Sequence, residues 1–161
     1  AAGAPEGLVI LANQQIAGRG RLGRDFYSPP DTGLYLSLLL RPRQMQPQHA
    51  TRITTMAALA ACEAIEAVTQ QQPQIKWVND IFLESKKVCG ILTEGSFNLE
   101  TGQLDDVVVG VGFNVYPPAG GFPPEIAEIA DSILQKQHSG NRKVHCGFHA
   151  DCQPQCIGAG Y

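Results

Sequence analysis

The positions of apolar residues divide the first part of the chain into two strands, a long polar loop and a helix. Residues 8–12 and 34–40 are short continuous apolar runs, a pattern typical of buried strands. Residues 13–33 between them are polar and rich in glycine and arginine, and a loop of about twenty residues in a compact domain is usually functional or disordered. Residues 48–72, before Pro73, have the apolar spacing of a helix, and its expected buried stripe is Ile53, Met56, Ala60, Ala64 and Val68, widened by Leu59, Cys62 and Ile65.

The second part of the chain predicts a series of adjacent strands. Residues 75–83, 87–97 and 105–115 have strand-like patterns, and their connections are too short for a parallel crossover. These strands should therefore be antiparallel neighbours. A second helix is expected over residues 124–136, because proline suits a first helical position. The predicted fold class is α+β, with a mostly antiparallel or mixed sheet and helices packed on one face.

Composition and charge exclude several classes of protein. With 43% apolar and 17% charged residues, the 161-residue chain is expected to form one folded domain. It contains no apolar run near the ~20 residues that span a bilayer, and its first residues lack the pattern of a secretory signal. A cytoplasmic protein without a membrane partner is therefore expected. The net charge of -3 argues against nucleic-acid binding, which favours a basic surface.

The cysteines fall into two groups. Cys62 and Cys89 stand alone in apolar surroundings and are expected to be small buried side chains. The other three lie in the tail, residues 138–161, which lacks periodicity and is expected to be irregular and separate from a domain over residues 1–137. A zinc site is the alternative for this tail, but its spacings miss the usual paired cysteine pattern; the residues concerned are His145, Cys146, His149, Cys152 and Cys156.

The polar loop contains a glycine-rich motif. Residues 18–23, Gly-Arg-Gly-Arg-Leu-Gly, match the letters of a dinucleotide-binding fingerprint, but that fingerprint must close a strand tightly and open a helix. Here Pro29-Pro30 follows, so no useful helix can begin. Two interpretations remain: a solvated basic surface loop, or an anion-binding loop in which Arg19, Arg21 and Arg24 supply paired donors.

Three motifs in order resemble those of biotin protein ligases. The loop, residues 14–24, resembles the biotin-binding loop of that family, and residues 76–80, Lys-Trp-Val-Asn-Asp, are similar to its Lys-Trp-Pro-Asn-Asp motif. Residues 87–94 follow at the expected distance, and residues 110–114, Gly-Val-Gly-Phe-Asn, resemble its Gly-x-Gly-x-Asn strand. The resemblance covers roughly residues 8–135 and is specific because the three motifs occur together.

The resemblance implies a two-step reaction. Biotin is activated by ATP, with Mg²⁺, to biotinyl-AMP, and the biotinyl group then passes to a lysine of a biotin carboxyl carrier protein. Fixed positive charge is needed to bring the two anionic substrates together. The resemblance also allows a homodimer.

Matching motif to motif implies roles for individual residues. Lys87 falls on the lysine that bridges the biotin carboxylate and the phosphate. Asp80 falls on a carboxylate that helps hold Mg²⁺ or steers the acceptor amine, and Asn79 and Asn114 are the nucleotide-binding candidates. The residues implied in biotin binding are Gln15, Gly18, Arg19, Gly20, Arg21, Lys87 and Gly90, of which Lys87 and Arg21, together with Asp80, form the implied catalytic set.

Each of these roles has a structural alternative. Lys87 would be an exposed hairpin lysine, as Lys86 is expected to be, and Asp80 a carboxylate at the edge of a hairpin. Either asparagine would close a turn. Trp77 is expected in the core rather than as a platform for adenine.

The chain also departs from the family pattern. Val78 stands where the family usually has proline, and the family's Ser-Thr-Asn segment, winged-helix region and small C-terminal β domain have no counterpart in these residues. The domain is therefore expected to be truncated at both ends. The alternatives to a ligase are a non-catalytic biotin-binding fragment and a related lipoate ligase or transferase, although the arginine-rich loop argues against lipoate.

Overall fold

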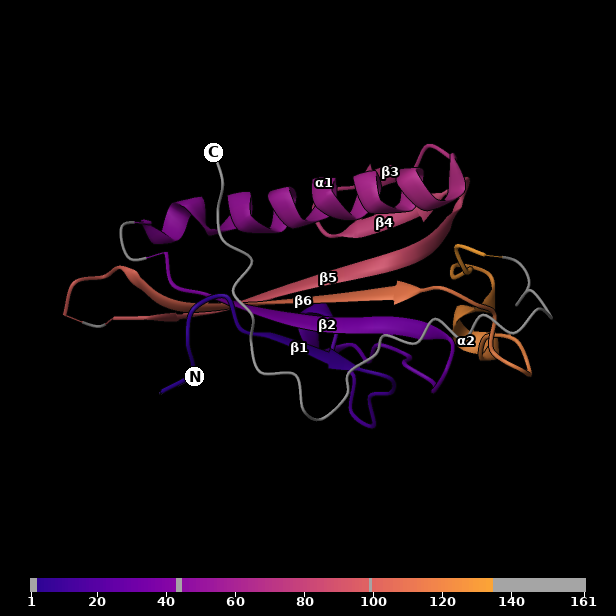
Figure 1. The fold of residues 1–161 in the computed structure, drawn as a ribbon, viewed down its shortest axis with the longest axis horizontal. Coiled ribbons are helices and arrows are strands. Elements are labelled where there is room, and N and C mark those ends of the chain that lie inside the picture. The colour runs from indigo at the N-terminus through magenta and orange to yellow at the C-terminus, as the bar shows by residue number, and fades with distance from the viewer. Residues whose placement is uncertain (1–2, 43–44, 99, 135–161) are drawn as a thin grey trace, which may run out of the picture.

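The computed structural model describes residues 3–42, 45–98 and 100–134, which form one antiparallel sheet with a long helix on one face (Figure 1). The order of strands in the sheet is β1-β2-β6-β5-β4-β3, and every neighbouring pair is antiparallel. The bounds are Val9–Ala12 for β1, Gly33–Leu40 for β2, Gln74–Lys76 for β3, Asp80–Leu83 for β4, Lys86–Phe97 for β5 and Leu104–Asn114 for β6. The predicted α+β class is confirmed.

The long helix α1, Ala50–Thr69, follows a short 3-10 turn, η2 at Pro47–His49, and packs mainly on β5, with further contacts to β3, β4 and β6. Its buried residues are Ile53, Thr54, Ala58, Ala61 and Ile65. Much of the predicted stripe is therefore wrong: Met56, Leu59 and Val68 are 68%, 52% and 70% exposed. The alanine-rich helix offers more than one apolar stripe, and the sheet contacts the one on which small side chains allow close approach.

Residues 75–83, predicted as one strand, form two. β3 and β4 pair as a tight hairpin in which Lys76 lies opposite Asp80, so the chain turns at Trp77, Val78 and Asn79. The Trp77–Val78 peptide bond is cis. Trp77 is 75% exposed, so the expectation that it lies in the core is wrong. The turn contains no glycine or proline, and for this reason the sequence pattern did not reveal it.

The second predicted helix is much shorter than expected. α2 covers only Pro124–Ala127, and residues 135 and 136 of the prediction lie outside the described residues. The chain after α2 is held by backbone hydrogen bonds to the ends of two strands. Lys87 N donates to Ile129 O and Asp131 N to Lys87 O, while Ile133 N donates to Asn114 O. These pairings satisfy backbone groups that a longer helix would have paired internally.

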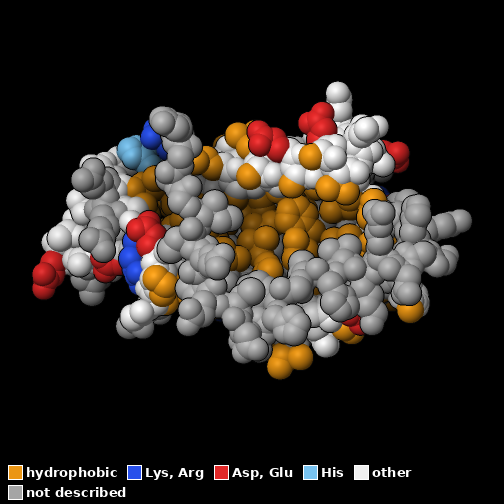
Figure 2. Space-filling model, in the orientation of Figure 1, with side chains coloured by type: hydrophobic (Ala, Val, Ile, Leu, Met, Phe, Trp, Pro, Cys, Tyr) orange, Lys and Arg blue, Asp and Glu red, His pale blue; other side chains and the backbone are white. Residues whose placement is uncertain are grey.

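The two faces of the sheet differ. On the α1 face, Ile91 lies opposite Val111 and Thr93 opposite Val109, and Thr93 forms a hydrogen bond with Thr54 of α1. The same face continues over β2 and β1, which are not among the strands that α1 mainly contacts; Val9 and Leu11 are 47% and 39% exposed there. Figure 2 shows apolar side chains gathered in a hollow below α1. The opposite face carries paired glycines and bears the arginine-rich loop.

Three further expectations concern the cysteines and the membrane. Cys89 is fully buried, as predicted, and burial raises the pKa of its thiol, which keeps it protonated, while Cys62 is half-buried. The histidines and cysteines of the tail lie outside the described residues, and the described part contains no group of three potential metal ligands. Within the described ranges, no helix has the length and apolar character needed to cross a membrane.

The buried face of α1 can be tested by one pair of substitutions. Ile65→Ala should destabilise the fold by about 2–5 kcal/mol, because it removes a fully packed side chain and leaves a cavity. Val68→Ala, one turn further along and 70% exposed, should change stability by no more than about 0.5 kcal/mol. Urea unfolding followed by circular dichroism measures both. Equal losses at the two positions would contradict the assigned face.

Candidate functional site

The arginine-rich loop, residues 13–32 between β1 and β2, is anchored on the sheet by one aromatic ring. Phe26 lies over Gly90 of β5 and Gly112 of β6; a Cβ atom on Gly90 would stand 2.9 Å from the ring, and one on Gly112 would be closer still. Tyr35 of β2 meets the ring edge to face at 6.4 Å between centroids. The loop therefore packs on a part of the sheet that has no side chains on this face.

The base of the loop is fixed by a second set of contacts. Phe26 N donates to Gly18 O at 2.9 Å. Gly18 is buried, and a side chain there would collide with the Phe26 carbonyl and with Ser28. Ser28, itself 4% exposed, donates from its hydroxyl to Gln15 Oε1 at 2.7 Å. Gln15 and Gly18, both predicted ligand-binding residues, thus define the shape of the loop.

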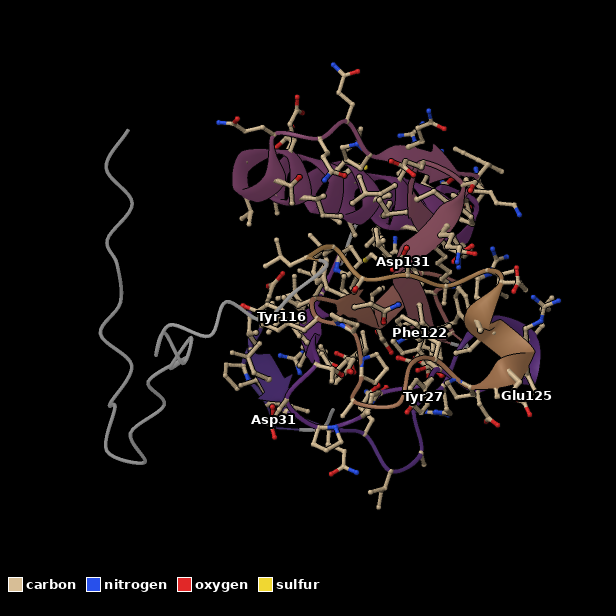
Figure 3. All side chains as sticks on the ribbon, turned by 90° about the vertical axis from the view of Figure 1, so that its right-hand side faces the viewer. Tyr27, Asp31, Tyr116, Phe122, Glu125 and Asp131 are labelled. Atoms are coloured by element: carbon tan, nitrogen blue, oxygen red, sulfur yellow. The ribbon has the colours of Figure 1, made fainter. Side chains whose placement is uncertain are left out.

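The loop also touches the segment after β6. The rings of Tyr27 and Phe122 meet edge to face at 6.4 Å, and Figure 3 shows these two side chains at the same end of the molecule. Both flanks of the loop are therefore supported, one by the sheet and the other by this segment.

The tip of the loop is a tight turn that presents the arginines. Gly20 N donates to Arg24 O at 2.7 Å, and the 3-10 turn η1, Arg21–Gly23, has a positive φ at Leu22 and at Gly23. The chain then continues into β2 and not into a helix, which confirms that the dinucleotide fingerprint is not formed. Arg19 reaches Glu94 of β5 at 3.6 Å, a pair that is largely exposed and therefore weak.

A lysine–carboxylate pair lies beside the loop on the strands. Lys87 Nζ stands 2.8 Å from Asp80 Oδ1, and the two side chains are only 28% and 27% exposed. The same ammonium lies 5.8 Å from the centroid of the Phe26 ring and close to Gly90. Lys87 is therefore not an exposed hairpin lysine. Lys86 is not fully exposed either, because its ammonium donates to Ala127 O at 3.2 Å.

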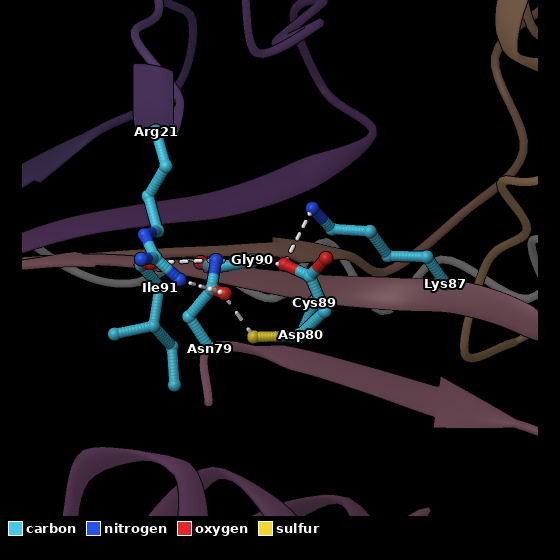
Figure 4. A network of polar contacts seen from close by, with 7 residues as sticks. All are labelled: Arg21, Asn79, Asp80, Lys87, Cys89, Gly90 and Ile91. Carbon is cyan, nitrogen blue, oxygen red and sulfur yellow. Dashed lines mark hydrogen bonds and ion pairs between the residues drawn. The ribbon is translucent and has the colours of Figure 1, made fainter. Parts of the chain in front are cut away.

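Four predicted site residues form one connected network (Figure 4). Arg21 Nη1 donates to Asn79 Oδ1 at 2.9 Å, and Asn79 Nδ2 donates to Asp80 Oδ1 at the same distance. Asp80 in turn holds Lys87. The structure therefore brings together residues from the loop, the β3–β4 turn and two strands, although they are separated by up to 66 positions in the chain (87 − 21).

Asn114 does not join this network. Its Nδ2 donates to Asp131 O at 3.1 Å, so its side chain holds the segment after α2 against the end of β6. This contact joins two distant segments and does not close a turn, the structural alternative that the sequence left open for Asn114.

A hollow of about 670 Å³ opens beside the network, between the loop tip, the start of α1 and β5. It is lined by Arg19, Arg21, Thr54, Val78, Thr93 and Glu94 among others, but it does not include Lys87 or Asp80. The site thus has a cationic wall formed by the loop and a separate ammonium on β5. Fixed guanidinium and ammonium groups in such an arrangement suit an anionic ligand.

The comparisons with known proteins agree with this geometry. The family model of the biotin/lipoate A/B protein ligase family matches residues 2–114. The bifunctional ligase/repressor BirA of Bacillus spizizenii is 41% identical over 132 residues, which cover 82% of this chain and 40% of that protein. The biotin–[acetyl-CoA-carboxylase] ligase of Paracoccus denitrificans is 37% identical over 118 residues, 71% of this chain and 48% of that protein.

A solved structure shows the same fold. The biotin protein ligase from Aquifex aeolicus in complex with biotin and ATP superposes with a TM-score of 0.66 and 34% identity, covering 81% of this chain and 51% of that one. The fold is thus shared with a solved biotin protein ligase. The chain belongs to the biotin/lipoate A/B protein ligase family. It spans between two fifths and about half of the length of these relatives.

Some contacts of the site were not predicted from the sequence. Phe26 was read only as part of a polar loop, although the glycines at positions 90 and 112 are a signal that something approaches the sheet closely. Glu94, the last residue of the motif at 87–94, had no role predicted from the sequence, and it contacts Arg19. The exposed position of Trp77, three residues before Asp80, was missed because the turn was missed.

The seat of the loop can be tested with two glycines of the same strand. Gly112→Ala should cost roughly 1–3 kcal/mol and loosen the loop, because a Cβ atom there collides with the Phe26 ring. Gly110→Ala is the matched control, since its Cβ would meet the nearest atom at 3.5 Å, an ordinary contact. Thermal unfolding and limited proteolysis at the loop arginines measure both effects. A Gly112 variant as stable and resistant as the Gly110 variant would show that Phe26 does not anchor the loop.

Proposed function

We propose that this chain carries the biotin-activating site of a biotin protein ligase. The observation that carries the proposal is the connected set of Arg21, Asn79, Asp80 and Lys87. In this set the loop guanidinium of Arg21 and the strand ammonium of Lys87 are joined through Asn79 and Asp80. The reaction needs this charge, because the biotin carboxylate and the ATP phosphates are both anions. The named ligase relatives support biotin over lipoate, although the family model covers both.

The chemistry we propose has two steps. A biotin carboxylate oxygen attacks the α-phosphorus of ATP, an oxygen–phosphorus bond forms, and pyrophosphate leaves. The amine of a lysine on a biotin carboxyl carrier protein then attacks the carbonyl carbon of biotinyl-AMP, and AMP leaves. We assign Lys87 to the carboxylate and phosphate oxygens, since a compact ammonium can follow the negative charge between them.

The loop supplies the rest of the proposed biotin site. Gln15, Gly18, Arg19, Gly20 and Arg21 would surround the ligand from the loop side, with Gly90 leaving room on β5. The sequence motifs make Asn79 and Asn114 the candidates for nucleotide binding. The exposed indole of Trp77 offers a flat apolar surface near Asp80 for a purine ring.

Asp80 is the proposed partner for Mg²⁺. Magnesium is commonly held by one or two carboxylates together with substrate phosphates, so a single carboxylate beside the phosphate position fits it. The metal would neutralise phosphate charge, while the ion pair with Lys87 keeps the carboxylate in place. We also propose that the protein is cytoplasmic and forms a homodimer.

The alternative proposal is that these residues bind biotin without completing the reaction. Calorimetric titration with biotin, with and without ATP and Mg²⁺, separates the two. Binding of biotin that ATP strengthens, with release of pyrophosphate, supports the ligase. Binding without turnover supports the alternative, and no binding at millimolar biotin contradicts both.

Lys87→Ala should lower pyrophosphate release by at least about a hundredfold, because it removes the ammonium that meets both anions. Lys86→Ala is the matched control, since this neighbouring lysine only donates to a backbone carbonyl. A coupled assay for pyrophosphate measures both, and thermal unfolding confirms that each variant is folded. If Lys87→Ala retains the rate of the wild type, the lysine has no part in the first step.

Arg21→Gly should let biotinyl-AMP leave faster. A charge-assisted hydrogen bond from a guanidinium contributes about 1.5–3 kcal/mol, so its loss should accelerate departure about 10- to 150-fold. Free biotinyl-AMP reacts with exposed lysines, and attached biotin on an unrelated lysine-rich protein in the mixture reports its escape. A variant that forms the adenylate but labels that protein no more than the wild type would exclude Arg21 as the residue that retains it.

A further inference from the structure

The amide of Asn79 has one allowed orientation. Its Nδ2 donates to Ile91 O at 3.2 Å and to Asp80 Oδ1 at 2.9 Å, which uses both of its hydrogens. The opposite orientation would place Oδ1 against two acceptors and Nδ2 against the Arg21 donor. Oδ1 must therefore face the loop, where it accepts from Arg21 Nη1 at 2.9 Å.

The position of Asn79 in the sheet reinforces this orientation. Ile91 N donates to Asn79 O at 2.8 Å, so Asn79 extends the pairing of β4 with β5 by one residue. Its backbone and its side chain are thus both bonded to the same residue of β5. Asn79 is half-buried, while the loop tip that it contacts is exposed. Asn79, which is bonded to the sheet, therefore holds Arg21 on the exposed loop tip.

Asp80 Oδ1 receives two donors, Asn79 Nδ2 and Lys87 Nζ. An amide that bonds on one side to this carboxylate and on the other to Arg21 fixes the guanidinium relative to the ammonium. We propose that Asn79 is a positioning residue that sets the place of Arg21 against Lys87 before any ligand arrives. The proposal rests on the proposed function for its meaning in the reaction, and it assigns Asn79 a role other than direct contact with the nucleotide.

The first test needs no ligand. Gly20 N and Arg24 N are bonded within the loop tip, to Arg24 O and Arg21 O, so their hydrogen exchange reports whether the tip is held. Asn79→Ala and Arg21→Ala should each speed this exchange, measured by NMR on the full chain, by at least roughly tenfold, the low end of the effect of losing one hydrogen bond to a charged group. The double variant should be no faster than either single one, because both remove the same contact.

Two further variants serve as controls for this test. Asn79→Asp cannot donate to Ile91 O or to Asp80, but it retains an acceptor for Arg21, and a carboxylate bonds a guanidinium more strongly than an amide does. Its loop tip should therefore exchange as slowly as in the wild type. Asn13→Ala is the matched control, since it removes a side-chain hydrogen bond, to Asp31, at the other end of the same loop. It should leave the exchange of Gly20 and Arg24 unchanged. Additive effects in the double variant, or normal exchange in Asn79→Ala, would overturn the proposal.

A second measurement distinguishes positioning from nucleotide contact. With biotin and ATP, a positioning role predicts that Asn79→Ala releases biotin faster and lowers kcat, with recovery of biotin retention in Asn79→Asp. A direct nucleotide contact predicts a raised KM for ATP alone and a loop tip that exchanges normally, which would overturn the inference. If the wild type binds no biotin, the proposed function fails, while the ligand-free exchange still decides whether Asn79 holds Arg21.

Discussion

The loop that carries the arginines is placed by the contact of one phenyl ring with a strip of sheet that has no side chains. Phe26 can lie on β5 and β6 only because positions 90 and 112 are glycines opposite each other in the register of the two strands. The ring is then held by Tyr35 at its edge and by Lys87 near its face. This contact holds the arginine-rich loop on the sheet next to Lys87.

The two ion pairs of the site differ in how far they are exposed to solvent. Lys87 and Asp80 are about a quarter exposed and close enough for a strong contact, whereas Arg19 and Glu94 are much more exposed. A half-buried pair holds its geometry, and an exposed pair is readily exchanged for another partner. The lysine is thus held in place by Asp80, while Arg19, whose pair with Glu94 is exposed, can exchange that acceptor for another.

The sequence predicted the features that depend on local pattern. The strand pairs β4–β5 and β5–β6 follow from short connections, and the loop from its glycines and arginines. The β3–β4 turn was missed because Trp77 and Val78 favour strands and no glycine or proline marks the turn. The short α2 was missed because residues 129–134 pair with the ends of β5 and β6, contacts between distant parts of the chain that no local pattern shows.

The same limit applies to the candidate site. Motif resemblance named Arg21, Asn79, Asp80 and Lys87 separately, but the bonds between them depend on the fold. The choice of face on α1 was decided by the sheet: alanines lie at 0% and 4% exposure, while a methionine and a valine point outward. Size and fit at an interface thus outweighed hydrophobicity along the helix.

The pairing of β2 with β6 also has a consequence for local unfolding. β1 and β2 join the rest of the sheet through this single strand pair, and β1 lies at the outer edge with exposed side chains. Both ends of the arginine-rich loop belong to this unit, whereas Lys87 and Asp80 belong to the part that α1 covers. Opening of the β2–β6 ladder would therefore separate the two halves of the site while leaving the helix packed. A ligand that bridges the halves would oppose that opening by a free energy that rises with the logarithm of its concentration above its Kd.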